Sequence, residues 1–212
     1  PYDTYYVYDQ YNNLRFVLPP EAIHRFTPAP NAIISNNNRY IYVYKYDDKN
    51  RMNVKIVPGA DSVYMIYDPR DRLVLVQDSV LRLSNNWKFL KYDTLNRPVL
   101  TGVKQISGSR TSVQNTVNSY YTNHRFCERR QGLANTTDHG YTDNAYPSGV
   151  SDNEYLTVTY YDDYLFIYSS TNYGYPVSPA PPAPYNSNVK LDNPEGLVTG
   201  SRVRNLDNNA WY

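Results

Sequence analysis

The sequence predicts an all-β protein made of tandem antiparallel β-hairpins that form a curved sheet. The main reason is an internal repeat in the first hundred residues: Tyr-Asp, two free positions, then Asn or Asp, usually followed by Arg. Successive copies lie about 20–40 residues apart, a spacing typical of repeat proteins whose units bury their apolar faces against one another. A second reason is that aromatic and β-branched runs, which favour strands, stand before and after the copies.

Each copy is predicted to form the turn of a hairpin. The Asp carboxylate can accept hydrogen bonds from backbone N–H groups two residues on, as in an Asx-turn. The fifth position is expected to have a positive φ, where Asn and Asp are the best tolerated residues after Gly. The Arg that follows can pair with the Asp of its own turn or with that of a neighbouring copy. The repeat motif comprises Tyr8, Asp9 and Asn12; Tyr46, Asp47, Asn50 and Arg51; Tyr67, Asp68, Asp71 and Arg72; and Tyr92, Asp93, Asn96 and Arg97.

Hairpins are expected to occupy most of residues 1–103. The alternation within residues 40–46 places four Tyr side chains on one face of a strand and Ile41 and Val43 on the other. An interruption between the first two copies contains Pro20, which favours a short helical turn because Pro is well tolerated at the first position of a helix. Lys91, just before the fourth copy, is expected to be exposed.

Residues 104–154 are predicted to be an insertion between repeats, because the strand pattern lapses there. Thr111-Ser112-Val113-Gln114 matches a capping box, so a short helix is expected near residues 111–122, lying across the sheet. The residues at helical spacing are Val113, Val117, Tyr120 and Tyr121. Residues 132–149 have the composition of a loop, and Asp143 and Glu154 lie in or beside this loop with no evident partner.

Residues 155–212 are predicted to continue the hairpins. Strand character returns at 154–162 and 164–168, and one further strand pair is expected around Asp207-Asn208-Asn209. The proline-rich stretch 176–184 cannot lie in a central strand and is expected to be extended polyproline. The three regions 1–103, 104–154 and 155–212 are interpreted as one continuous repeat architecture that forms part of a larger protein.

The repeat resembles the YD repeat of the RHS family, and Lys91–Gly102 looks like a clean copy. The sequence segments 8–22, 155–164 and 196–204 are similar to segments of RHS-like proteins of Bacteroidetes-type bacteria. The resemblance implies repeats that coil as a continuous β-ribbon into a hollow shell, which commonly encloses a variable C-terminal region, often a toxin. The family signature that closes the shell, with its autoproteolytic Asp, has no counterpart in this sequence.

Composition narrows the partners that the chain is expected to have. The formal net charge is +1 with 19% charged residues, so no overall field attracts nucleic acid or an anionic membrane. No apolar run approaches the length of a membrane span. A single cysteine, Cys127, excludes an internal disulfide framework. The bias toward Tyr, with 25 Tyr against 5 Phe, suits a thin sheet that has solvent on one side, because Tyr buries a ring while its hydroxyl stays wet.

Catalytic residues, metal ligands and cofactor-binding residues are not predicted. The adjacent pairs Asp47-Asp48 and Asp162-Asp163 would point to opposite faces of a strand. A metal site could be assembled from His124, Cys127, Asp138 and His139, but structural zinc usually shows four clearly spaced ligands. The interpretation is therefore that the chain is not an enzyme and binds no cofactor.

The expected function is a non-catalytic structural segment of a secreted or cell-surface RHS-like protein. As the resemblance implies, the segment would help to build a β-shell that encloses or presents a C-terminal effector, so its partners would be neighbouring repeats and that cargo. The alternative is a cell-surface adhesion or carbohydrate-binding module, because Tyr rings on a sheet can stack against sugars.

Overall fold

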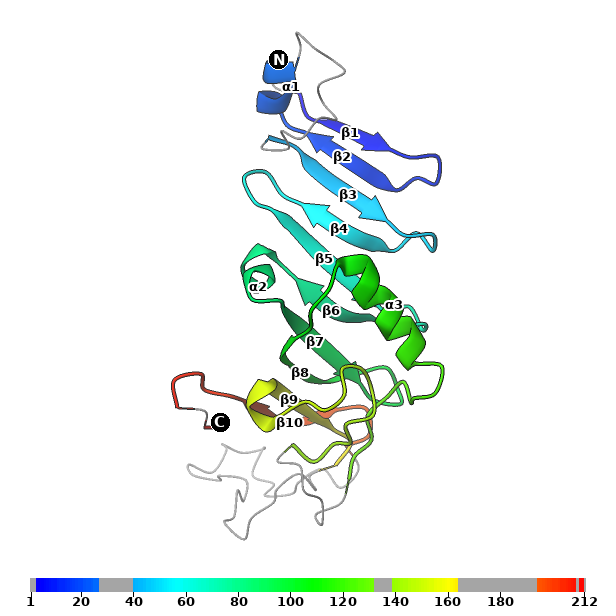
Figure 1. The fold of residues 1–212 in the computed structure, drawn as a ribbon, viewed down its shortest axis with the longest axis vertical. Coiled ribbons are helices and arrows are strands. Elements are labelled where there is room, and N and C mark those ends of the chain that lie inside the picture. Colours follow the sequence, from blue (N-terminus) through cyan, green and yellow to red (C-terminus); the bar gives the residue numbers. More distant parts are fainter. Residues whose placement is uncertain (1–2, 27–39, 132–138, 164–193, 209, 212) are drawn as a thin grey trace, which may run out of the picture. The chain divides into compact units, whose positions relative to one another are not determined.

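The computed structural model describes residues 3–26, 40–131, 139–163, 194–208 and 210–211. Within these ranges ten β-strands form one antiparallel sheet, and they are hydrogen-bonded in the same order as they occur in the chain (Figure 1). The strands are β1 (Tyr5–Tyr8), β2 (Leu14–Leu18), β3 (Tyr42–Tyr46), β4 (Met52–Ile56), β5 (Ser62–Tyr67), β6 (Leu73–Gln77), β7 (Asn86–Tyr92), β8 (Pro98–Gln105), β9 (Tyr155–Tyr161) and β10 (Val198–Val203). The prediction of an all-β protein made of tandem antiparallel hairpins is confirmed.

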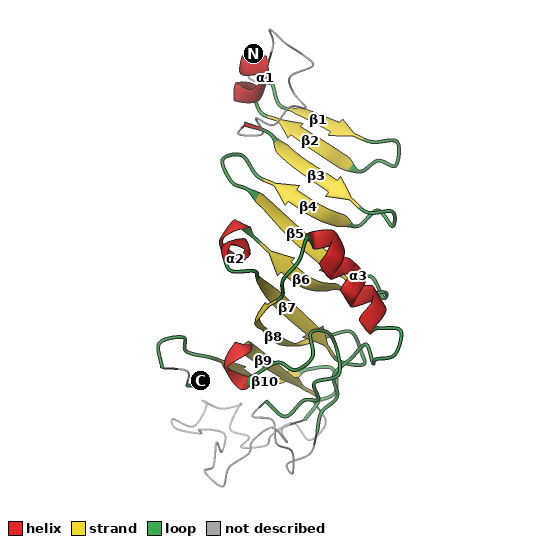
Figure 2. Ribbon diagram, viewed as in Figure 1, coloured by secondary structure: helices red, strands yellow, loops and turns green. Residues whose placement is uncertain are grey.

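Short helices connect some of the strands (Figure 2). They are α1 (Pro20–Phe26), α2 (Ser79–Leu83), α3 (Arg110–Tyr120) and a single turn of 3-10 helix, η3 (Asp152–Glu154). None of the described helices has the length and apolar character needed to cross a membrane. The chain divides into two compact units: unit one contains residues 1–89 and 103–124, and unit two contains residues 90–102 and 125–212.

The first hairpins of unit one bury one face of the sheet beneath α1. The core there consists of Leu18, Ala22, Ile41 and Val43. Ile41 and Val43 are buried while their Tyr neighbours are only partly covered, so the predicted alternation along residues 40–46 is confirmed. The helical turn expected at Pro20 is also present, and it extends to seven residues as α1.

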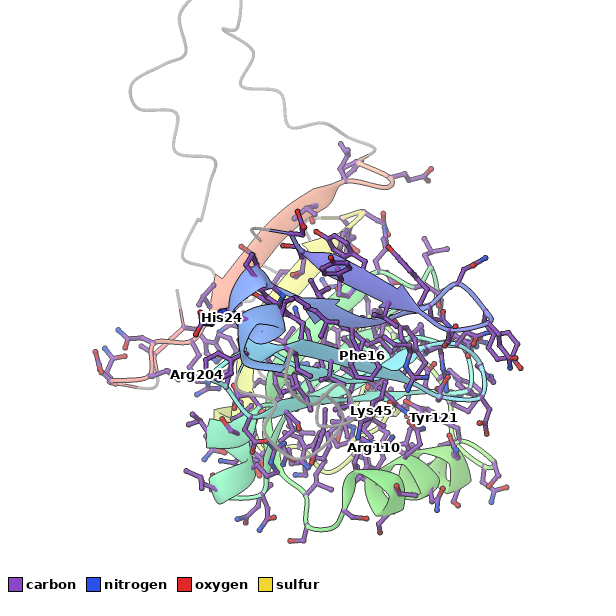
Figure 3. All side chains as sticks on the ribbon, turned by 90° about the horizontal axis from the view of Figure 1, so that it is seen from above. Phe16, His24, Lys45, Arg110, Tyr121 and Arg204 are labelled. Atoms are coloured by element: carbon purple, nitrogen blue, oxygen red, sulfur yellow. The ribbon has the colours of Figure 1, made fainter. Side chains whose placement is uncertain are left out.

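Helix α3 packs against β5 in unit one, and its predicted apolar side chains Val113 and Val117 are both buried. Its N-cap is Ser109, whose Oγ accepts a hydrogen bond from the N–H of Ser112 at 3.2 Å. The capping box predicted at Thr111 is therefore wrong by two residues: Ser109 takes the cap, and Thr111 lies in the first turn. Arg110 and Tyr121, at the two ends of this helix, are labelled in Figure 3.

Unit two buries Leu100 of β8 together with Tyr155, Val158 and Tyr160 of β9. The strand expected at residues 154–162 is confirmed as β9. Arg204, labelled in Figure 3, follows β10 and is buried; its guanidinium donates to the carbonyls of Tyr155 and Asp152.

Of the strand pair predicted around Asp207-Asn208-Asn209, the described residues show only a single antiparallel bridge between Arg204 and Trp211, because β10 pairs with β9 instead. Two other predictions, the strand at 164–168 and the polyproline stretch at 176–184, fall outside the described residues.

Candidate functional site

The four repeat turns share one backbone geometry. In the turn at Asp47, the Asp47 N–H donates to the carbonyl of Arg51 at 3.0 Å, and the Asn50 N–H donates to the carbonyl of Asp47 at 2.9 Å. The equivalent two bonds close the turns at Asp9, Asp68 and Asp93. The predicted positive φ at the fifth position is confirmed in every copy: the angles are 62° at Asn12, 59° at Asn50, 63° at Asp71 and 63° at Asn96.

The Asp side chain stabilises each turn by accepting hydrogen bonds from the backbone of that turn. In the third copy, Asp68 Oδ1 accepts from the N–H groups of Arg70 and Arg72 at 2.9 and 3.0 Å. The carboxylates of the other three copies accept from the same two positions, which confirms the Asx-turn prediction. Asp68 Oδ2 accepts from Arg72 Nε at 2.8 Å, and the pairs Asp47–Arg51 and Asp93–Arg97 repeat this contact at 2.8 and 2.7 Å.

The Tyr and Arg of the motif reach the neighbouring copy, a role that the turn geometry alone does not reveal. Tyr67 Oη donates to the carbonyl of Met52, in the preceding hairpin, at 2.7 Å, and Tyr46 Oη donates to Leu14 in the same way at 2.9 Å. The guanidinium of Arg51 lies 4.8 Å from the centre of the Tyr67 ring and also pairs with Asp71 at 2.7 Å. We refer to these bonds between consecutive copies as the interlock.

A fifth turn of this kind joins β9 to β10. The Asp162 N–H donates to the carbonyl of Leu197 at 3.1 Å, and Asp162 Oδ1 accepts from the N–H of Gly196 at 2.8 Å. Gly196 has the positive φ of the fifth motif position, 80°, but Asp162 also has a positive φ, 70°, which the Asp of the other four turns does not. Tyr161 Oη donates to the carbonyl of Pro98 at 3.2 Å, as the interlock requires. The dipeptide Tyr161-Asp162 is visible in the sequence, but Gly196 lies 34 positions beyond Asp162, so a fixed spacing cannot detect this turn.

The interlock of the fifth turn includes a bidentate ion pair. Arg97 donates from both terminal nitrogens to Asp162, at 2.8 and 2.6 Å, and its guanidinium lies 4.2 Å from the centre of the Tyr161 ring. The hydrogen bonds from Arg97 lower the pKa of Asp162 from its ordinary value of 3.8 to about 2. This carboxylate is therefore ionised at neutral pH.

A second group of polar residues is buried in unit two around Lys91. The sequence-based expectation that Lys91 is exposed is wrong, because its side chain is completely buried. The reason is the alternation in β7, where Trp87, Phe89 and Lys91 occupy every second position and all three are buried. Lys91 Nζ lies 3.2 Å from Glu128 Oε1 and contacts Asp143 Oδ1.

The loop segments that follow residue 125 supply the two carboxylates and fix them through backbone groups. Glu128 accepts from the N–H groups of Asn144 and Ala145, both at 2.9 Å, and from the hydroxyl of Thr142 at 2.6 Å. Asp143, for which the sequence shows no evident partner, contacts Lys91. Glu154 also has a partner: its carboxylate accepts from the N–H of Ser151 at 2.8 Å and completes the capping box of η3.

The side chains considered for a metal site have other roles. His124 stacks on Tyr120 with 3.8 Å between ring centres, and His139 Nδ1 accepts from the N–H of Tyr141 at 3.1 Å. Cys127 is a free thiol of intermediate exposure, and Asp138 lies outside the described residues. Among the residues that the structure describes, no group of three His, Cys, Asp or Glu side chains is arranged to hold a metal ion.

The fold and the turn series together define a β-hairpin repeat protein. The sequence matches no family model and no curated relative. Solved structures that resemble the chain include crystal structures of TcdB2-TccC3-Cdc42, of TcdB2-TccC3-TEV and of TcdB2-TccC3 without hypervariable C-terminal region. They are 13% identical, with TM-scores of 0.36, 0.37 and 0.36. The matches cover 74% of this chain and 9% of those chains.

Proposed function

We propose that the chain is a non-catalytic wall segment of a larger, RHS-like YD-repeat protein of the Bacteroidetes type. In this proposal consecutive hairpins build a β-shell, and the shell encloses or presents a C-terminal effector in a secreted or surface-attached protein. The interlock between copies is the observation that supports the proposal.

The motif divides its polar groups between two tasks. The Asp carboxylate shapes its own turn, whereas the Tyr hydroxyl donates to the preceding hairpin and the Arg guanidinium reaches the ring and turn of the following one. The second copy therefore contacts a neighbour on both sides, through Tyr46 toward the first copy and through Arg51 toward the third, as expected of repeats that are stabilised by their neighbours. A catalytic role would require such groups to face a substrate, but here they bind other parts of the sheet.

Containment can be tested by limited proteolysis of the intact gene product that includes this chain. The variant Arg51→Ala with Tyr67→Phe removes the guanidinium and the hydroxyl that join consecutive turns while leaving the Asp of each turn in place. Val80→Ala is the matched control, because Val80 is 72% exposed. We expect the region that follows this segment to resist protease in the wild type and in the control, and to be cut in the interlock variant. Equal and rapid cutting of that region in the wild type would contradict containment.

A carbohydrate-binding function is the second candidate, and exposed tyrosines favour it. Tyr5, Tyr6, Tyr8 and Tyr11, in and after β1, are between 50% and 65% exposed. Exposed Tyr rings can stack against the faces of sugar rings. A glycan array probed with the chain and with the variant Tyr6→Ser, Tyr8→Ser separates the two functions. Binding that disappears in the variant would support sugar recognition, whereas containment alone predicts no binding.

A further inference from the structure

The buried group around Lys91 carries more charge than a simple ion pair. The side chains of Lys91 and Glu128 are 0% exposed, and that of Asp143 is 26% exposed. One ammonium and two carboxylates leave a formal charge of −1 in a site largely removed from water. Burying ions in this way is costly unless the geometry is excellent or the ions are converted to neutral groups.

The geometry around Asp143 matches what acyl transfer requires. Lys91 Nζ, a primary amine, contacts Oδ1 of this carboxyl group. The other oxygen, Oδ2, accepts from the N–H groups of Gly149 and Val150 at 2.7 and 3.2 Å. Two backbone donors on one carboxyl oxygen form a preorganised site for the negative charge that develops when a nucleophile attacks the carbon.

Glu128 is placed to carry protons during such a reaction. Its Oε1 lies 3.2 Å from the attacking nitrogen, within reach for proton transfer. Hydrogen bonds from Thr142, Asn144 and Ala145 hold the carboxylate in this position. The three components of an amide-forming site, which are a nucleophile, an oxyanion site and a proton carrier, are thus present in one buried cluster.

We infer that Lys91 and Asp143 form an intramolecular isopeptide bond, with Glu128 as the proton carrier. A proton first passes from the Lys91 ammonium to the Asp143 carboxylate, so that the amine and the carboxylic acid are both neutral. Nζ then attacks Cγ, and Oδ2 takes up negative charge beside Gly149 and Val150. Glu128 accepts a proton from Nζ and returns it to Oδ1, which leaves as water. One C–N bond forms, one C–O bond breaks, and one water molecule is released without oxidation or reduction.

Several features of the site favour the amide product. Holding the amine in contact with the carboxyl group converts an encounter in solution into a reaction within one molecule, an advantage equivalent to effective concentrations of about 10⁵–10⁸ M in well-oriented cases. The ring of Tyr155 lies 5.9 Å from Nζ, and its hydroxyl is 3.4 Å from Asp143 Oδ1. Burial, followed by the nearby carboxylates of Asp143 and Glu128, raises the pKa of Tyr155, so its hydroxyl remains a donor. The exposed part of Asp143 provides an exit for the released water.

The bond would join β7 to the loop that contains Asp143, 52 positions further along the chain. A covalent link across such a span restricts the unfolded chain, and the effect increases with the length of the closed loop. The chain has only one cysteine and cannot make an internal disulfide, so an amide is a cross-link that its side chains can form. This inference does not depend on the proposed wall function.

The mass of the purified, denatured wild-type chain tests the inference directly. We expect a mass lower than that of the sequence by one water molecule, and a proteolytic digest that contains a branched peptide joining Lys91 to Asp143. A folded wild-type chain with the full sequence mass and two separate linear peptides would overturn the inference. A reduced mass without the branched peptide would do so as well, because the water would then have been lost elsewhere.

Three variants separate the roles of the residues. Lys91→Arg keeps the charge but lacks a primary amine, so it should retain the full mass. Asp143→Asn should lose ammonia instead of water and reach the same final mass as the bonded wild type. Glu128→Gln should also retain its full mass, and bond formation at the wild-type rate in this variant would rule out Glu128 as the proton carrier. If a variant fails to fold, wild-type chain that is produced unfolded and has never folded still tests the inference, since its mass should fall only as it folds.

Discussion

The substitution Asp68→Ala is expected to destabilise unit one by about 3–5 kcal/mol, the usual cost of removing one partner from a buried ion pair. The Asp68 side chain is 0% exposed, and its carboxylate accepts four hydrogen bonds: two from the N–H groups of Arg70 and Arg72, and two from the Arg72 guanidinium. The substitution leaves the Arg72 side chain, which is only 9% exposed, without its carboxylate partner. The cavity left by the missing carboxylate and the N–H donors left without an acceptor therefore both destabilise the folded state.

The repeat supplies its own control for this experiment. Asp9 occupies the same position in the first turn, but it is more exposed and lies 3.5 Å from Arg15 instead of making the close pair seen at Asp68. Asp9→Ala should therefore cost clearly less than Asp68→Ala, although the two substitutions are chemically identical.

Urea denaturation followed by tryptophan fluorescence measures the difference, since Trp87 is fully buried in unit one. The midpoint should fall while the slope stays constant, because the surface exposed on unfolding is unchanged. A loss of about 3–5 kcal/mol corresponds to a decrease in Tm of about 6–20 °C, at about 2–4 °C per kcal/mol. Equal losses at the two positions, or a loss at Asp68 within about 0.5 kcal/mol of zero, would refute the view that carboxylate burial sets the strength of each turn.

Three other predictions concern the turns and α3. Asn96 has a φ of 63°, a conformation that strains a β-branched residue but not Gly. Asn96→Val should therefore destabilise the fold by about 1–2 kcal/mol in thermal unfolding, whereas Asn96→Gly should not. Equal stabilities of the two variants would contradict backbone strain at this position. The pKa of Asp162 is about 2 when it is paired with Arg97 and 3.8 ordinarily, so this pair stabilises the fold above about pH 4, and its contribution is lost as the pH falls toward 2. Asp162→Asn should remove this part of the pH dependence of the free energy of unfolding, which denaturation at neutral and acidic pH measures. An unchanged dependence on acid would contradict the role of this ion pair. The Gln114 side chain in α3 hydrogen-bonds to both the N–H and the carbonyl of Tyr67 in β5, at 3.2 and 2.7 Å. Gln114→Ala should therefore lower the free energy of unfolding by about 1–2 kcal/mol and speed hydrogen exchange in α3. Unaltered exchange would show that these two hydrogen bonds are not needed to hold α3 on the sheet.

The turns could be predicted from the sequence because their chemistry is local. An Asp that accepts from N–H groups two and four positions on, and an Asn that tolerates a positive φ, depend only on residues within one hairpin. The buried positions of α3 could be predicted for a related reason, since helical periodicity is a property of the segment itself. The cap was predicted wrongly at Thr111, because Ser109, which takes it, lies only two positions earlier in the chain.

The buried group at Lys91 could not be predicted because its partners lie far along the chain. Glu128 and Asp143 come from loops that carry no periodic signal, and lysine is only rarely buried unless it is paired. A weak signal did exist, since Lys91 continues the alternation of Trp87 and Phe89 in β7. Helix α2 was missed for a different reason: Val80 and Leu83 are 72% and 89% exposed, so its short sequence has no buried apolar face to reveal it.

The fifth turn shows that a turn of this kind can form even when a long stretch of sequence separates its two ends. Asp162 closes the corner against Gly196 and Leu197, although Gly196 lies 34 positions further along the chain, and β9 still pairs with β10. Doubling the length of such an excursion adds only about 0.6 kcal/mol of closure entropy. Foreign peptides grafted between the Asp and the positive-φ residue of another copy, for example after Asp48, should therefore be displayed without loss of strand pairing. The architecture offers a row of sites at which new segments can be acquired while the sheet stays the same.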